Sequence, residues 1–404
     1  MAKILFLTTA NLSTNPRLVK EALLAIHSGH QINIVAFDLG GIYQQKDQEV
    51  INKIGEDNVT YLTDNRSNFL SWLFFSLLHK FISYLFQGSP SVKLNAYTIT
   101  KRTMILDAYL RIKKRKWQVD IVIAHNIGAF YPAYVFAKSS NIQLAIDIED
   151  YHPGELVLSG NPQKQTYAKE EVMRKILPSC MYVSFASPII EKTTINMLSS
   201  RDIQKPLTLL NSFYSSEFRA PSPISGKIRF IWFSQYLSLD RGLRLFLNAV
   251  NTIGWADLEL SLIGLRNETF DQEFEHYENN SIKVITPMTQ TQLHQELSTF
   301  DIGLAIDLTS HDFNRDIALT NKIFAYYQAG LYSIITDTAA QRDFLNSNSS
   351  SGILTEQSTN GFEESIGHIL LNIDQIRNGA EKRYQEAKSI AFENEGKKLL
   401  PFWS

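Results

Sequence analysis

The 404-residue chain is poor in cysteine, carries little net charge and contains no long hydrophobic run free of polar residues. Cys180 is its one cysteine, which excludes a disulfide framework and any multi-cysteine metal site. The net charge of −2 argues against a broad basic surface, so we expect no nucleic-acid partner. The apolar run at residues 4–7 is too short for a signal peptide, and we therefore expect a cytoplasmic protein.

Glycine is missing from the turn after the first predicted strand, Lys3–Leu7. The residues that follow this strand are Thr8, Thr9, Ala10 and Asn11. A turn that binds the pyrophosphate of a dinucleotide uses glycines to let the backbone approach the phosphates. Their absence disfavours an enzyme that uses nicotinamide or flavin.

Short hydrophobic strands alternate with helices through most of the chain, which is typical of parallel α/β sheets. The chain is longer than a single core usually supports, so two domains are expected. The stretch 214–225 is rich in Ser and Pro and is predicted to be a linker. We predict an N-terminal Rossmann-like domain over 1–213, a C-terminal one over 226–385 and a tail over 386–404. In the irregular part, 40–118, we expect polar turns followed by long helices.

An apolar helix is predicted at Phe69–Phe86. Its polar residues fall on one helical stripe, at Ser76, His79, Lys80 and Ser83. A lysine near the middle argues against a helix that spans a membrane. The helix is therefore predicted to be amphipathic, with its wide apolar face either in the core or on a membrane surface. The basic run Arg111–Lys116 is expected to cover a solvated helix end, or to join this helix on an anionic membrane.

The stretch 319–337 has the pattern of a helix followed at once by a buried strand. Short polar residues at 320 and 321 suit the helix start, and Gly330 suits a left-handed position at its end. Lys322 lies in the first turn of this helix, and Arg315 lies just upstream. Because helix N-termini and nearby cations attract anions, the stretch predicts a site for a group such as a diphosphate.

Two predicted strands of the first half end in titratable residues. His125 follows the predicted strand Asp120–Ala124, and the loop after the predicted strand Gln143–Ile146 contains Asp147, Glu149, Asp150 and His152. Ligands bind beyond the carboxyl ends of strands in open α/β sheets, so these side chains are candidates for substrate contact. Asp147 and Glu149 have the spacing of a metal-binding Asp-x-Asp pair. Nothing else nearby marks a metal site, and no metal dependence is predicted.

In the second half, the loop Ser234–Gly242 follows the predicted strand Ile228–Phe233. It carries Gln235 and Arg241. A guanidinium can bind two phosphate oxygens at once, so Arg241 is a candidate for phosphate binding, although a solvated surface arginine would look the same in the sequence.

Several of these segments resemble motifs of GT-B-fold glycosyltransferases, in particular the retaining group 1, or family 4, type. The segment NKIFAYYQAG at 321–330 is similar to their donor-binding motif, and SQYLSLDRG at 234–242 is similar to the loop whose cations neutralise the diphosphate. In the first half, STNPRLVKEA, the His125 strand end and DIEDYH are also similar to this group. AFENE at 391–395 resembles the helix that crosses back to the first domain.

The resemblance implies an α/β enzyme with two doubly wound domains facing a cleft, which moves a sugar from a nucleotide-sugar to an acceptor with retention of configuration. The acceptor would be a saccharide or a lipid-linked saccharide in polysaccharide or glycolipid synthesis, and the helix Phe69–Phe86 could seat its lipid at the inner face of a membrane. No cofactor is implied besides the nucleotide-sugar substrate. The candidate residues are His125, Glu149, Asp150 and His152 for catalysis, Ser234, Gln235, Arg241, Arg315, Asn321 and Lys322 for donor binding, and Asn11 and Arg17 on the acceptor side.

Two residues depart from the family pattern. Gln235 stands where the family has an arginine, and Ala325 stands where it usually has a glutamate that binds the ribose hydroxyls. Alanine cannot accept those hydrogen bonds. These departures leave open a non-catalytic binding protein with a degenerate donor site. A sugar-nucleotide epimerase, which uses the same fold, is a separate alternative.

Overall fold

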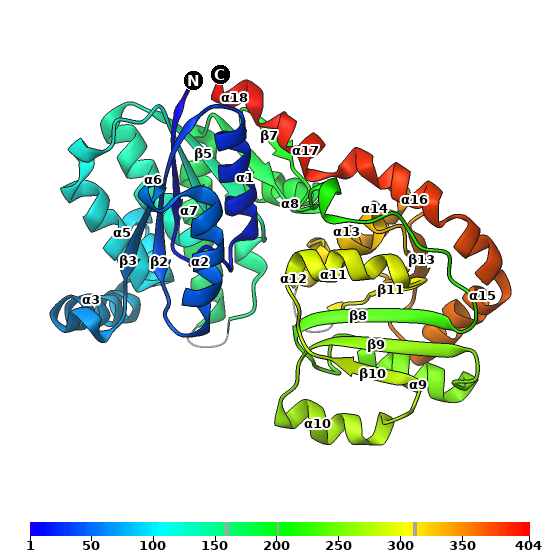
Figure 1. The fold of residues 1–404 in the computed structure, drawn as a ribbon. Helices are drawn as coiled ribbons and strands as arrows, with labels where there is room; N and C mark the ends of the chain where they lie inside the picture. The colour runs from blue at the N-terminus through cyan, green and yellow to red at the C-terminus, as the bar shows by residue number, and fades with distance from the viewer. Residues whose placement is uncertain (158–160, 200–201, 310–312) are drawn as a thin grey trace. The chain divides into compact units, whose positions relative to one another are not determined.

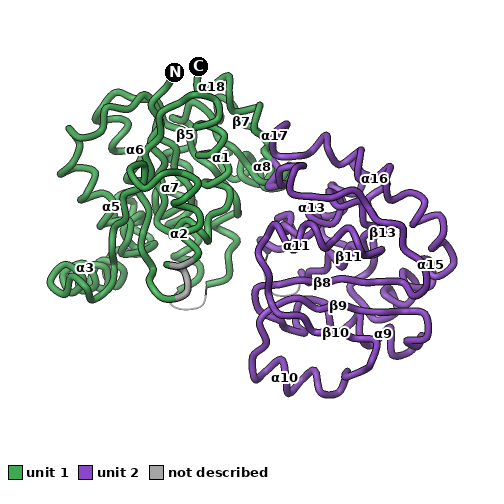
Figure 2. Tube along the Cα trace, in the orientation of Figure 1, with its two compact units in different colours: residues 1–209, 396–404 green, residues 210–395 purple. Residues whose placement is uncertain are grey.

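The structure, a computed structural model, describes residues 1–157, 161–199, 202–309 and 313–404. They form two compact units (Figures 1 and 2). Unit 1 consists of residues 1–209 and 396–404, and unit 2 consists of residues 210–395. Each unit contains one sheet, and all the strand pairs described in the two sheets are parallel.

The sheet of unit 1 has the strand order β3-β2-β1-β4-β5-β6-β7. Its strands are β1 Lys3–Thr8, β2 Gln31–Asp38, β3 Val59–Thr63, β4 Ile121–His125, β5 Gln143–Ile148, β6 Tyr182–Phe185 and β7 Pro206–Thr208. The order reverses direction between β1 and β4, and the carboxyl ends of these two strands form the topological switch point where doubly wound sheets bind ligands.

The helices of unit 1 are α1 Pro16–His27, α2 Ile42–Ile54, α3 Phe69–Phe86, α4 Val92–Ile99, α5 Lys101–Ile112, α6 Ile127–Ser140, α7 Pro162–Ile176, α8 Pro188–Leu198 and α18 Leu400–Trp403. α1 begins at Pro16 because the Asn15 side chain accepts a hydrogen bond from the Leu18 amide, which caps the first turn. The last helix fixes the chain end to unit 1, since Trp403 is fully buried and its Nε1 donates to the Tyr182 hydroxyl at 3.2 Å.

Unit 2 has a sheet of order β10-β9-β8-β11-β12-β13. Its strands are β8 Ile228–Tyr236, β9 Leu258–Leu265, β10 Ile282–Ile285, β11 Ile302–Ala305, β12 Tyr332–Thr336 and β13 Gly352–Thr355. Its helices are α9 Leu243–Ile253, α10 Glu268–Phe274, α11 Gln290–Glu296, α12 Phe313–Ile317, α13 Asn321–Gln328, α14 Ala339–Ser347, α15 Thr359–Asn378, α16 Ala380–Ala387 and α17 Phe392–Glu395.

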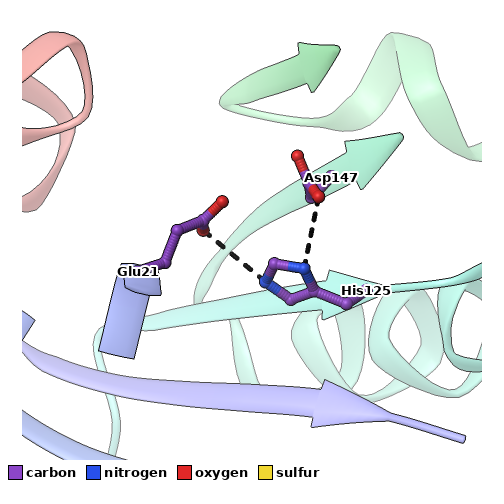
Figure 3. A group of neighbouring side chains, drawn as sticks. All are labelled: Glu21, His125 and Asp147. Carbon is purple, nitrogen blue, oxygen red and sulfur yellow. Dashed lines mark ion pairs between the residues drawn. The ribbon is translucent and has the colours of Figure 1, made fainter. Parts of the chain in front are cut away.

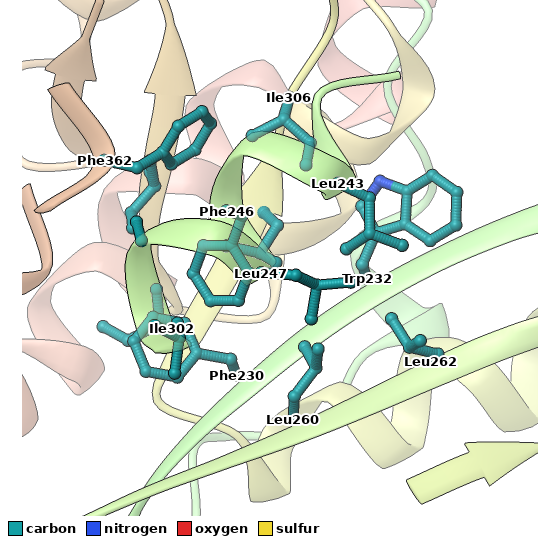
Figure 4. Packing of buried hydrophobic residues seen from close by; sticks show 14 of the residues in the cluster. Phe230, Trp232, Leu243, Phe246, Leu247, Leu260, Leu262, Ile302, Ile306 and Phe362 are labelled. Atoms are coloured by element: carbon teal, nitrogen blue, oxygen red, sulfur yellow. The ribbon is translucent and has the colours of Figure 1, made fainter. Parts of the chain in front are cut away.

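The core of unit 2 lies between its sheet and two helices (Figure 4). Phe246 of α9 is fully buried, and its ring centroid lies 5.3 Å from that of Phe230 in β8 and 6.0 Å from that of Phe362 in α15. Leu243 and Leu247 extend the same contact along α9. This packing holds the sheet rigid beneath the loops at the carboxyl ends of its strands.

The predicted α/β fold is confirmed, but the expectation of polar turns before the helix at 69–86 is wrong. Residues 42–54 form α2, and residues 59–63 form β3 at the edge of the sheet. β3 is held by pairing with β2, for example Tyr61 with Ala36, and its half-buried residues carry little periodic signal. β4, β5 and β8 also run further than predicted, so His125, Asp147 and Ser234 belong to strands rather than loops.

Candidate functional site

A polar hollow of about 500 Å³ lies in unit 2, at the carboxyl end of β8 and the amino end of α13. It is lined by Phe233, Ser234, Gln235, Tyr236, Ser238, Arg241, Thr320, Asn321 and Lys322. Five of the six predicted donor-binding residues therefore line one hollow, and the sixth, Arg315, lies in α12 close enough to influence the charge of Lys322.

The turn between β8 and α9 brings Arg241 to this hollow. Gly242 has a φ of +89°, a conformation that residues with a Cβ rarely adopt, and it directly precedes α9. The register of β8 with β9 also shifts between Phe233 and Tyr236, and pairing resumes with Tyr236 opposite Leu265. The strand end and the glycine turn together place Arg241 beside the residues at the end of β8.

The start of α13 supplies the other side of the hollow. Thr320 is the N-cap residue, but its side chain makes no capping hydrogen bond, so the predicted side-chain cap is wrong. Gly330 has a φ of +80° just after the helix, as predicted. The Lys322 ammonium lies 5.5 Å from the centroid of the Trp232 ring, and the side chain is almost fully buried.

Electrostatics in this hollow favour an anion. Burial lowers the pKa of Lys322 to about 8. The Asp307 carboxylate works against this change, whereas the charges of Arg241 and Arg315 lower the pKa further. Among the described residues, Lys322 is influenced by the cations Arg241 and Arg315 and by the Asp307 carboxylate, and a bound phosphate group would relieve the repulsion between the cations.

The two departures from the family pattern lie on either side of this hollow. Gln235 is exposed and lines it. Ala325 is fully buried in α13 and has no polar side-chain atom with which to bind a ribose. The cations therefore remain available for a diphosphate, while the ribose contact expected from the family has no counterpart at position 325.

Buried charges meet in unit 1 between α1, β4 and β5 (Figure 3). The His125 ring lies between two carboxylates, with Nε2 3.5 Å from Glu21 Oε2 and Nδ1 3.3 Å from Asp147 Oδ2. The Arg17 guanidinium contacts the same carboxylates, at 2.7 Å from Asp147 Oδ1 and 3.7 Å from Glu21 Oε1. The Ser184 hydroxyl also donates to Asp147 at 2.5 Å.

This cluster is buried, and its members shift the pKa values of His125 and Asp147. Burial on its own would lower the pKa of His125, but Glu21 and Asp147 outweigh it and raise the pKa to about 9. Burial would likewise raise the pKa of Asp147, but Arg17 and His125 hold it at about 2. Arg17 and His125 are at most 1% exposed, so neither offers surface to a substrate in this structure.

Glu21 belongs to this cluster and was not predicted from the sequence. It stands four residues after Arg17 on α1, and residues at this spacing lie on one helix face. Glu21, His125 and Asp147 are also a group of described residues that could in principle hold a metal ion. Arg17 already pairs with both carboxylates, which makes the group an ion-pair cluster.

Asn11 is also buried and serves the structure of the loop after β1. Its Nδ2 donates to Ser13 Oγ at 2.7 Å and to Asp47 Oδ1 at 2.9 Å. Asp47 of α2 further accepts hydrogen bonds from the Ser13 amide and the Tyr61 hydroxyl. α2 and β3, both missed from the sequence, therefore fix the loop on which Asn11 lies.

The acidic loop after β5 has one half-buried pair and one buried histidine. Glu149 and Asp150 are partly accessible, and burial together with the charge of Asp150 raises the pKa of Glu149 to about 7. His152 is 6% exposed, and its Nδ1 lies 2.7 Å from Glu155 Oε1. Because this ring is buried and pairs with Glu155, we expect it not to contact a substrate directly. Of the predicted catalytic residues, Glu149 and Asp150 remain the most accessible.

Comparison with known proteins identifies the fold. No protein-family model matches the sequence, and no curated protein matches it. Anabaena HepE in complex with UDP is 12% identical, with a TM-score of 0.70 over 99% of this chain and 99% of that one. A glycosyltransferase from Rickettsia africae is 12% identical, with a TM-score of 0.68 over 100% of this chain and 97% of that one.

These structures establish that the chain has the GT-B fold, as the resemblance implied. A Listeria monocytogenes structure assigned as a UDP-N-acetylglucosamine 2-epimerase shares this fold at 11% identity, with a TM-score of 0.58 over 99% of this chain and 95% of that one. The fold by itself therefore does not distinguish a transferase from an epimerase. That distinction has to come from the side chains of the site.

Proposed function

We propose that the protein transfers a sugar from a nucleotide-sugar to an acceptor, and that the hollow in unit 2 binds the nucleotide diphosphate. The convergence of Arg241 and Lys322 in this hollow, with Arg315 nearby, is the observation that carries the proposal. Negative charge develops on the diphosphate as the sugar leaves, and fixed cations in a poorly hydrated site stabilise that charge.

Arg241 and Lys322 have different parts in this proposal. The planar guanidinium of Arg241 suits two oxygens of one phosphate, which fixes the orientation of the diphosphate. The Lys322 ammonium is held over the Trp232 ring, and an approaching dianion would favour its charged form. Because these cations can neutralise the diphosphate, we propose that transfer needs no metal ion. We also propose that the anomeric configuration is retained, as in the glycosyltransferases whose motifs the sequence resembles.

The base and the acceptor are proposed from comparison and from chemistry. HepE was solved with UDP and with UDP-glucose, which makes UDP the first nucleotide to test here. Glu149 and Asp150 are proposed to contact acceptor hydroxyls, with Arg17, Asn11 and His125 as positioning residues. We further propose a saccharide or lipid-linked saccharide acceptor in polysaccharide or glycolipid synthesis, and a cytoplasmic protein that works at a membrane surface.

Replacing Arg241 or Lys322 by Ala is expected to weaken binding of the preferred nucleoside diphosphate at least tenfold, since each removes a charge that faces the phosphates. Isothermal titration calorimetry with UDP, GDP and ADP measures this directly. Arg244→Ala is the matched control, because Arg244 lies in the first turn of α9, three residues after Arg241, but pairs with Glu273. Unchanged affinity in both test variants would rule out the proposed site.

The same experiments separate the alternatives. A degenerate binding protein would bind no nucleotide at all, which would make Ala325 and Gln235 the decisive residues. Epimerase activity is tested as well, because the chain shares its fold with a structure that is assigned as an epimerase. Conversion of a nucleotide-sugar to its epimer without any acceptor would favour the epimerase over the transferase.

A further inference from the structure

The helix α3 carries a continuous apolar face on the outside of unit 1. Large hydrophobic side chains along its whole length are exposed, from Leu70 at 78% to Tyr84 at 86%. The exposed set is Phe69, Leu70, Phe74, Leu77, Phe81, Tyr84, Leu85 and Phe86. At 100° per residue, the residues from Phe69 to Leu85 in this set fall within one half of the helix circumference. Isolated exposed hydrophobics are ordinary, but a patch of this extent marks a binding surface.

The opposite side of α3 packs on the protein. Ile82 is the one buried residue of α3, all of whose residues the structure describes. The stripe of Ser76, His79 and Ser83 is only half-exposed, and His79 lies against the Thr98 backbone of α4. The apolar face therefore does not belong to the core, and the prediction of a core role for it is wrong.

The chain around α3 carries more positive than negative charge. From residue 65 to residue 106 there is no Asp or Glu, although the whole protein has a net charge of −2. The cations in this stretch are Arg66, Lys80, Lys93, Lys101 and Arg102, of which Lys101 and Arg102 pair with Asp64 at 3.8 and 2.8 Å. Lys80 on α3 and Lys93 on α4 are exposed, and Arg66 and Lys101 lie over the Trp72 ring at 4.9 and 5.8 Å. Apolar surface and positive charge are thus combined at one place.

We propose that α3 lies in the plane of an anionic membrane surface, with its apolar face in the boundary between head groups and acyl chains. A helix with exposed Phe and Leu on one face and cations beside it is suited to this position. Aromatic residues at both ends, Phe69 with Trp72 and Tyr84 with Phe86, suit the same interface. The exposed lysines would contact acidic head groups.

Two other arrangements fit the observations less well. A spanning helix would have to detach from α4, and would place Lys80 and His79 among acyl chains. A second copy of the chain would bring the exposed lysines of two protomers, Lys80 and Lys93, close together.

The proposal concerns a surface of unit 1 and does not depend on an active donor site. It is tested by co-sedimentation of the full chain with vesicles of phosphatidylcholine alone or with 30% phosphatidylserine. We expect the wild type to bind the anionic vesicles. The triple variant Phe74→Ser, Leu77→Ser, Phe81→Ser should bind them at least tenfold more weakly. Lys80→Gln and Lys93→Gln should each weaken binding about fivefold. Leu265→Ser with Leu371→Ser, which removes two exposed hydrophobics of unit 2, is the control and should bind like the wild type.

A second measurement does not require the triple variant to fold. In Tyr84→Cys, an environment-sensitive thiol dye should label only the new residue, because Cys180 is buried. The fluorescence emission of the dye is expected to shift to shorter wavelengths when anionic vesicles are added. No shift, no binding of the wild type to anionic vesicles, or a dimer in solution that the triple variant abolishes would each overturn the proposal.

Discussion

Charged side chains that are withdrawn from solvent shape both candidate sites at the scale of single residues. In unit 1, Arg17 and His125 balance Glu21 and Asp147 in an environment with almost no exposed surface. Burying charges costs free energy that a good ion-pair geometry only partly offsets. The cluster is therefore better explained as a device that fixes the ends of β4 and β5 than as a source of stability.

Glu149→Gln is expected to change how stability depends on pH. The pKa of Glu149 in the folded protein, about 7, lies above that of an ordinary glutamate. Glu149 therefore makes its full contribution to the free energy of unfolding below pH 4.5, and this contribution is lost as the pH rises through 7. The variant has no titrating group there, so its free energy of unfolding should exceed that of the wild type by roughly 1–3 kcal/mol at pH 8 and match it near pH 4.5.

Urea unfolding at several pH values measures this difference. Glu49→Gln, at an exposed position of α2, is the control and should follow the wild-type curve. A parallel pH dependence in wild type and Glu149→Gln would show that Glu149 is not the group that titrates.

Single-residue roles were only partly predictable from the sequence. Arg241 and Lys322 could be assigned to one hollow, because strand ends and helix starts meet at one edge of a parallel sheet. The burial of His125, Arg17 and Asn11 could not be foreseen. It depends on carboxylates from distant segments, such as Asp47 for Asn11, and a single sequence does not reveal those partners.

At the scale of elements, the close packing of α13 on the sheet determines where the first turn of this helix lies. A Cβ atom on Gly303 of β11 would lie 2.3 Å from the ring of Tyr326, which is fully buried in α13. That ring also contacts Phe233, a lining residue of the hollow, at 5.3 Å between centroids. Glycine at 303 therefore permits the close approach that positions the donor-binding turn.

Gly303→Ala is expected to lower the free energy of unfolding of unit 2 by about 1–3 kcal/mol, because a rigid ring must move. Displacing α13 should also weaken nucleoside diphosphate binding several-fold. Gly367→Ala is the matched control. A Cβ there meets no atom within 4 Å, and alanine in a helix should stabilise by roughly 0.5–1 kcal/mol. Equal effects of the two substitutions on nucleotide affinity would contradict this account of α13.

Elements with a strong local signal were predicted well, and those held by distant pairing were not. The helices predicted at Phe69–Phe86 and in the stretch 319–337 are present as α3 and α13. β3 has no clear alternation and forms through its ladder with β2. The helix α3 was predicted as a helix, but the side that faces the protein could not be inferred, since it depends on how α4 packs.

At the scale of the whole molecule, the chain forms two compact units with separate sheets. Because each unit has its own core, heating can unfold them in separate steps. A ligand that binds only one folded unit raises the unfolding temperature of that unit alone. The destabilised variant Gly303→Ala identifies which step belongs to unit 2.

Thermal unfolding with UDP, GDP, ADP, dTDP and CMP is therefore the most direct test of the proposed donor site. At a hundredfold excess over the dissociation constant, the preferred diphosphate should raise the unfolding temperature of unit 2 by about 5 °C or more. The shift should persist in Arg244→Ala and fall by about half or more in Arg241→Ala. If none of the nucleotides changes the unfolding temperature of the wild type, the hollow is not a donor site and the transferase proposal is contradicted.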